Sequence, residues 1–404
     1  MSRPPRRLRG APALAGAAVL LLTACGGDPA EPSDGPAAGE SAEHGFVAGA
    51  EELAEPQLQL AYLDDAGSVH ALDLLTEEAA ALGEVGAVSA VGTDGRFLFA
   101  ASEPAGELTV VDTGTWTVDH GDHVHYYRAP AGVAGTLEWS GGVRVASSET
   151  LTALFSPDTG TGVVLDRAAL GQGEVTELAR VESEPHDGAL VPLGSRLVAT
   201  TADAVVALDL DGEPLPGAEA ECAEPRGGHP TRVGVVVSCA DGAVLATETD
   251  DGIDLERIAY PVPVADEERA GGLANRPGRP AVAAPAGDRG VWLLDTRARS
   301  WQLVPTETPW VRAVAAGDEE DRVVGVDAAG RVVVLTPDGR TAATEPLLPV
   351  DRLDQVDLQV AADRAYVNDP AGRRLLEIDY ADGARLARTF PAAVAPAHLA
   401  ETGR

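Results

Sequence analysis

The feature that most constrains the fold is an internal repeat with a period of roughly 40 residues. Each copy combines short runs of β-branched and apolar residues with a tight Asp-Gly or Ala-Gly turn, and many end in Leu-Asp or Val-Asp. Such runs and turns are typical of β-hairpins. The copies cover residues 60–74, 96–112, 196–209, 235–245, 281–295, 323–335 and 364–379, with a looser copy at 135–165.

Short strands repeated with this period predict an all-β fold, a β-propeller. The units count as eight blades, or as seven if the irregular third unit is an insertion. The first unit lacks a leading strand, and residues 397–401 near the C-terminus resemble it. We therefore expect a ring closed by a C-terminal strand, which removes an exposed sheet edge. Residues 75–82 are the one segment that suggests a helical turn, and a pair of β-sandwiches fits the unbroken period poorly.

The first 24 residues resemble a lipoprotein signal peptide. A basic start containing Arg6 and Arg7 precedes an apolar segment at 11–22, and Leu22-Thr23-Ala24-Cys25 resembles a lipobox. Cleavage before Cys25 and lipidation of its thiol would follow. The alternative is an ordinary secretory signal in which Cys25 is accidental.

Residues 25–55 are rich in Gly, Pro, Ala and acidic residues and predict a flexible tether, followed by the propeller at 56–404. No later segment is long and apolar enough to span a bilayer. The sequence thus predicts an extracytoplasmic protein, lipid-anchored to the outer face of the bacterial cell membrane and otherwise not in contact with it.

Cysteine usage fits such a compartment, because only Cys222 and Cys239 remain after Cys25. We expect a disulfide between them. The competing interpretation is a Cys-His metal site with His229, which lies between the two cysteines in the sequence.

The formal net charge of −34 makes nucleic acid an improbable class of partner, because phosphate binding requires a basic surface. An acidic surface also attracts cations, although solubility alone explains such a charge. We expect a monomer.

The few histidines carry the most evident chemistry of the chain, since neutral imidazole is a common ligand of Zn²⁺. Three of the 8 histidines stand in Asp119-His120-Gly121-Asp122-His123-Val124-His125, at the end of the second unit. In an extended strand His123 and His125 face the same side. His120 is left out of the predicted ligand set because Gly121 interrupts the segment.

Other histidines are expected near the channel, because the first strand of each propeller blade lines it. His186 and His229 fall at such leading strands, as does His398 if the ring closes as predicted. Asp187 is a further ligand or a residue that orients His186. The predicted Zn²⁺ site at one mouth of the channel contains His123, His125, His186, His229 and His398.

Several of these motifs together resemble the periplasmic zinc metallochaperones of the AztD type. They are the His123–Arg128 stretch, Pro185-His186-Asp187-Gly188-Ala189, and the Cys222, His229 and Cys239 segment. The resemblance implies a propeller that binds Zn²⁺ and passes it to the solute-binding protein of a zinc ABC transporter. The chain departs from that family in its lipobox and in a tether whose only histidine is His44.

The residues also bear on whether the protein is an enzyme. We find no Gly-x-Ser-x-Gly motif, no nucleophile next to a histidine and no plausible paired-carboxylate motif of a catalytic site. We therefore expect no enzymatic activity. Two alternatives stay open: a metal-dependent hydrolase or lyase, and a metal-free scaffold that binds proteins or glycans.

Overall fold

The computed structural model describes residues 47, 49–120, 123–250 and 252–404. The predicted signal peptide, the lipidation site Cys25 and His44 of the tether lie outside the described residues. None of the helices in the described part has the length and apolarity needed to cross a membrane.

The described residues form a nearly all-β structure of nine antiparallel sheets, seven with four strands and two with three. Eight of them follow one another along the chain. The first four, in order of pairing, are β34 (His398–Thr402), β2 (Gln59–Leu63), β3 (Ser68–Asp73), β4 (Ala79–Glu84); β5 (Ala90–Thr93), β6 (Phe97–Ser102), β7 (Glu107–Asp112), β10 (Gly132–Glu138); β11 (Arg144–Ser147), β12 (Leu151–Phe155), β13 (Thr161–Asp166), β14 (Glu177–Glu182); and β15 (Leu190–Leu193), β16 (Arg196–Thr200), β17 (Ala204–Leu208), β18 (Pro214–Glu221).

The next four sheets continue the series, and the ninth is an inserted sheet. They are β19 (Gly228–Pro230), β20 (Val235–Cys239), β21 (Gly242–Thr249), β22 (Gly252–Ala259); β23 (Ala281–Pro285), β24 (Val291–Asp295), β25 (Ser300–Val304); β26 (Trp310–Ala315), β27 (Val323–Asp327), β28 (Val332–Leu335), β29 (Thr341–Ala343); β30 (Leu358–Val360), β31 (Ala365–Asp369), β32 (Arg374–Asp379), β33 (Arg385–Pro391); and the inserted β1 (Glu51–Leu53), β9 (Val124–Arg128), β8 (Thr115–Asp119). The helices are short: α1 (Arg167–Leu170) and the 3₁₀ segments η1 (Asp266–Glu268), η2 (Gly287–Arg289) and η3 (Val350–Gln355).

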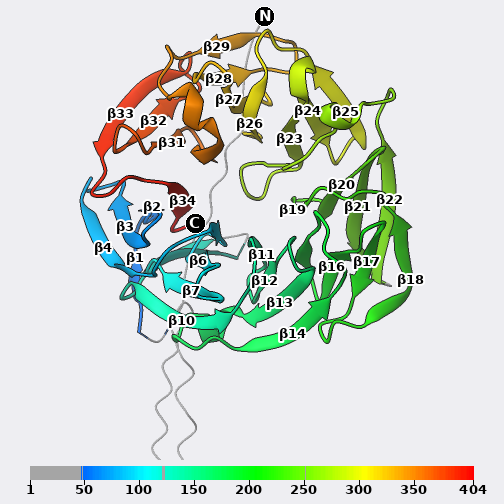
Figure 1. Ribbon diagram of the computed structural model, residues 1–404, viewed down its shortest axis with the longest axis horizontal. Helices are drawn as coiled ribbons and strands as arrows, with labels where there is room; N and C mark the ends of the chain where they lie inside the picture. Colours follow the sequence, from blue (N-terminus) through cyan, green and yellow to red (C-terminus); the bar gives the residue numbers. More distant parts are fainter. Residues whose placement is uncertain (1–46, 48, 121–122, 251) are drawn as a thin grey trace, which may run out of the picture. The chain divides into compact units, whose positions relative to one another are not determined.

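The series of sheets forms a ring, as Figure 1 shows, and the fold is the predicted β-propeller. The inner strands of neighbouring sheets contact one another in turn around the ring, from β34 to β5, β11, β15 and β19, and from β26 to β30 and back to β34. Between β19 and β26, the β-bridges of Ala274 and Asn275 continue the inner layer. The hydrophobic core lies between adjacent sheets, as in the cluster that joins Phe97 and Val110 of one sheet to Leu154 and Val163 of the next.

The C-terminal strand closes the ring, as the sequence predicts. β34 pairs with β2 in antiparallel register, with Leu399 opposite Tyr62 and Thr402 opposite Gln59. Most of β34 is buried. The first sheet is therefore built from both ends of the described chain, and β2 has no exposed edge on that side.

Two sequence expectations and one alternative need correction. Residues 75–82 do not form a helical turn: Asp73 Oδ1 accepts hydrogen bonds from the amides of Leu75 and Thr76 at a turn, and β4 then pairs with β3. Residues 51–53 were assigned to the tether but form β1. The third unit forms its own sheet, β11–β14, and the inserted segment lies instead between β7 and β10 of the second sheet. In each case the pairing of strands outweighed the local composition.

Candidate metal centre

The insertion in the second sheet is a β-hairpin made of β8 and β9. The chain leaves β7 after Asp112, forms the hairpin, and returns as β10, which pairs with β7 again. Gly114 stands at the base of the hairpin with a φ of +80°, and a Cβ atom there would lie 2.5 Å from the Ala129 carbonyl oxygen. A glycine is required at this position because the two strands approach so closely.

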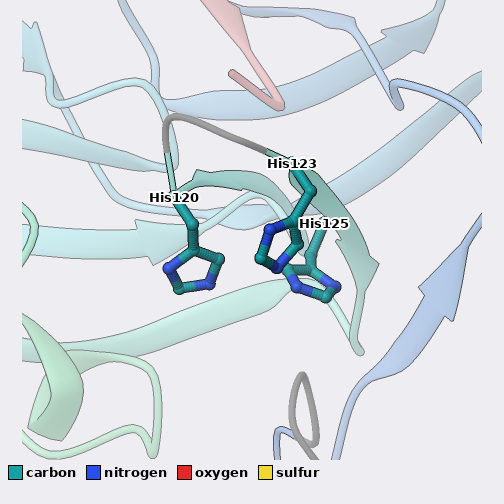
Figure 2. A group of neighbouring side chains, drawn as sticks. All are labelled: His120, His123 and His125. Atoms are coloured by element: carbon teal, nitrogen blue, oxygen red, sulfur yellow. The ribbon is translucent and has the colours of Figure 1, made fainter.

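His120, His123 and His125 gather at the far end of this hairpin. Their ligand atoms all lie within 4.8 Å of one another, and Figure 2 shows the three rings together at that end. The backbone amide of His120 donates to the carbonyl of His123, so both residues flank the hairpin end. His125 lies two residues further along the chain and pairs with Val118. The local hairpin geometry therefore brings all three rings to one place.

The three histidines differ in their exposure to solvent. His120 and His123 are exposed, whereas His125 is buried. The His125 ring stacks on Tyr127 at a centroid distance of 6.0 Å, and Tyr127 stacks in turn on Trp116 at 5.2 Å. Burial, and to a lesser extent the nearby Glu52 carboxylate, raise the pKa of the Tyr127 phenol above its ordinary value. The group thus has one ring set in an aromatic stack and two rings open to solvent.

A carboxylate from a distant part of the sequence also reaches the group. Glu52 lies on β1, which pairs with β9, and its Oε1 atom is 2.7 Å from His125 Nδ1. The side chain of Glu52 is 49% exposed and that of His125 is 10% exposed. No pattern in the sequence indicated this contact, because Glu52 stood in the segment assigned to the tether.

The base of the hairpin is held by contacts with the propeller. The guanidinium of Arg96 lies 3.6 Å from the centre of the Trp116 ring and makes two hydrogen bonds with Asp112. Arg128 on β9 contacts Gln57 and Asp73. Such contacts fix the hairpin at its base.

The C-terminal segment supports the same hairpin. The Thr117 hydroxyl donates to the Gly403 carbonyl at 2.8 Å. The strand that closes the ring therefore leads directly to a residue that touches β8.

The arrangement offers imidazole nitrogens to one small volume, which suits a metal ion such as Zn²⁺. Three protein ligands leave a fourth coordination position for water or for a ligand from another molecule. Because two of the three rings are exposed, that position is accessible from solvent. The geometry is therefore that of a group that could hold a metal ion.

The structure does not bring the other predicted histidines into this group. His186 contacts the Glu184 carbonyl and the Thr200 hydroxyl, each at 2.7 Å, and the neighbouring Asp187 pairs with Arg144. Within the described residues, the three-histidine group does not include His186, His229 or His398. The prediction that His186, His229 and His398 join His123 and His125 in one site was wrong.

His229 and His398 do lie on inner strands, as predicted, but in other surroundings. His229 on β19 is hydrogen-bonded to Asn275 at 2.9 Å, and burial lowers its pKa. His398 begins β34 near the carboxylate of Asp357. Sequence reasoning placed the two residues correctly on the strands but could not show which rings share one space. His120, which the predicted ligand set omitted, belongs to the group because its amide donates to the His123 carbonyl beside the β8–β9 pair.

Cys222 and Cys239 form the predicted disulfide, with a Cα–Cα distance of 5.1 Å. Their sulfur atoms are bonded to each other, so the alternative Cys-His metal site is wrong. The bond joins the end of β18 to β20 of the next sheet. A disulfide is typical of an oxidising, extracytoplasmic compartment.

Comparisons with known proteins bear on the fold. No protein-family model matches the chain, and no curated protein matches it significantly. The crystal structure of AztD from Citrobacter koseri has a TM-score of 0.74 at 18% sequence identity, and the match covers 86% of this chain and 98% of that chain. The chain is similar in fold to AztD.

Two further solved structures show the same architecture. Apo AztD from Citrobacter koseri matches with a TM-score of 0.72 at 17% identity, over 86% of this chain and 97% of that chain. The dihydro-heme d1 dehydrogenase NirN matches with a TM-score of 0.54 at 15% identity, over 87% of this chain and 76% of that chain. The resemblance to AztD inferred from the sequence motifs therefore extends to the fold.

Proposed function

We propose that this protein is an extracytoplasmic zinc-binding protein that holds Zn²⁺ through His120, His123 and His125. The observation that carries the proposal is the placement of three imidazole ligands within 4.8 Å of one another on one hairpin. The fold that the chain shares with AztD supports the same conclusion.

The chemistry of the group suits a carrier better than a permanent structural site. Structural zinc sites are closed by four protein ligands, whereas three imidazoles leave a position where a receiving protein can insert its own ligand. The exposure of His120 and His123 allows these ligands to be replaced one after another. We propose that the protein delivers its zinc in this way to the solute-binding protein of a zinc ABC transporter.

We propose further that lipidation of Cys25 anchors the protein to the outer face of the cell membrane, where such a transporter would take up the metal. The lipobox at residues 22–25 supports this location. Zn²⁺ is then cargo, and we assign the protein no enzymatic activity. The fold alone does not decide this point, because NirN, which shares it, is a dehydrogenase.

The site is tested by measuring zinc affinity in competition with a chromophoric chelator. We expect the wild-type protein to bind one Zn²⁺ tightly. His120→Ala and the double variant His123→Ala/His125→Ala should each lose at least about tenfold in affinity, because even the loss of a residue that only hydrogen-bonds a zinc ligand costs this much. His186→Ala is the matched control, since it removes an imidazole outside the group. Unchanged affinity in the double variant would falsify the assigned site.

A further inference from the structure

We propose that Glu52 is a positioning residue of the metal centre, and that strand β1 thereby links the chain before the propeller to zinc retention. The inference deepens the proposed function and rests on it. It assigns a role to a residue about which the sequence motifs say nothing.

The register of the inserted sheet explains why Glu52 reaches His125. Glu52 stands opposite Tyr127 in the β1–β9 pair, and His125 is two residues before Tyr127 on the same face of β9. Side chains that are diagonal neighbours across two antiparallel strands are close enough to interact. Glu52 and His125 thus meet although 73 residues separate them in the chain.

The contact has the chemistry that metal-binding histidines use. At 2.7 Å, the Glu52 carboxylate accepts the Nδ1–H of His125. Such a partner fixes the tautomer and the orientation of the ring, leaving the Nε2 lone pair for the metal ion, and it makes the ring a better electron donor. In the described residues, Glu52 is not one of the group whose ligand atoms lie within 4.8 Å of one another, so its role is orientation and not ligation.

This arrangement makes His125 the anchored ligand of the three. Its ring is 10% exposed, stacks on Tyr127 and is held by Glu52, whereas His120 and His123 are exposed. β1 itself is paired to β9 over three residues, from Glu51 to Leu53. So short a pairing is easily displaced. Displacement of β1 would withdraw the Glu52 carboxylate from His125 and so loosen the anchored ligand.

The test compares two neighbouring glutamates of β1 in the full mature chain. Glu52→Ala removes the contact, and Glu52→Gln keeps an oxygen that accepts from the ring but removes the charge. Glu51→Ala is the matched control, because Glu51 is exposed, lies on the opposite face of the strand and carries the same charge. We expect Glu52→Ala to weaken zinc binding about 10- to 100-fold, Glu52→Gln to weaken it less, and Glu51→Ala to leave it unchanged.

A second measurement does not depend on zinc. Long-range ¹H–¹⁵N spectra of the metal-free protein report which ring nitrogen of His125 carries the proton, and we expect Nδ1–H in the wild type and a mixture of tautomers in Glu52→Ala. The inference is overturned if Glu52→Ala keeps the wild-type affinity and tautomer, or if Glu51→Ala loses as much affinity. A wild-type protein that binds no zinc would instead contradict the proposed function, so the two failures are distinguishable.

Discussion

Individual histidines in this chain fall into two kinds of position. His120, His123 and His125 present their rings to one another at a hairpin end, whereas His186 and His229 are engaged by hydrogen bonds to Thr200 and Asn275. The hydrogen bonds of His186 and His229 satisfy polar ring atoms within the protein and so support the fold. The same residue type therefore forms the candidate metal-binding group in one place and hydrogen bonds within the propeller in another.

His229 makes this structural role measurable. Burial lowers its pKa below the ordinary value of 6.5; the hydrogen bond that the ring donates to the Asn275 amide oxygen opposes this shift, and the charge of Arg404 adds to it. As the pH falls below 6.5, the unfolded chain binds a proton that the folded protein resists, so the free energy of unfolding decreases. We expect the thermal midpoint to drop less in His229→Gln than in the wild type between about pH 7.5 and about pH 5.5. Equal drops, followed by circular dichroism, would contradict the assignment.

At the scale of elements, the β8–β9 hairpin is an insertion whose position depends on a few contacts at its base. Trp116 is buried between Arg96 and Tyr127, so it connects the hairpin to the propeller. We expect Trp116→Ala to lower the free energy of unfolding by about 3 kcal/mol and to weaken zinc binding, because the hairpin loses its support. Trp301→Ala is the control: Trp301 is equally buried, but in the core beside β24. It should lower stability without changing zinc affinity, and a loss of affinity there would argue against a local effect.

At the scale of the whole molecule, a noncovalent strand pairing closes the ring, and a covalent bond cross-links it elsewhere. β34 completes the first sheet, and the disulfide joins two neighbouring sheets across 17 residues of chain. We expect Cys222→Ala/Cys239→Ala to lower the free energy of unfolding by about 3 kcal/mol, because a disulfide that closes a loop of this length lowers the conformational entropy of the unfolded chain. Zinc affinity should stay the same, because neither cysteine contacts the hairpin group. Chemical denaturation and chelator competition check the two halves of this prediction, and a zinc affinity that falls with the disulfide would revive a role for the cysteines in metal binding.

Much of the fold follows from the sequence because its causes are local. Alternating apolar runs and Asp-Gly turns act over a few residues and specify strands and hairpins. The closing strand, at residues 398–402, was recognisable because the first unit lacked a leading strand and the C-terminal residues resemble one. The disulfide was expected because the propeller contains only two cysteines. His123 and His125 were placed on one face by the two-residue period of a strand.

The composition of the metal centre depended on the tertiary structure. His120 joins the group because its backbone amide donates to the carbonyl of His123, whereas His186, in the segment before β15, and His229 and His398, on inner strands, stay outside the group. Glu52 reaches His125 because β1 pairs with β9, and no local pattern determines which distant strand a three-residue segment will join. The sequence by itself therefore determined the strands, their turns and the type of ligand. Only the tertiary structure decided that Glu52 reaches His125 and that His186, His229 and His398 stay outside the hairpin group, because the pairing and packing of strands distant in sequence reflect free energies summed over many residues.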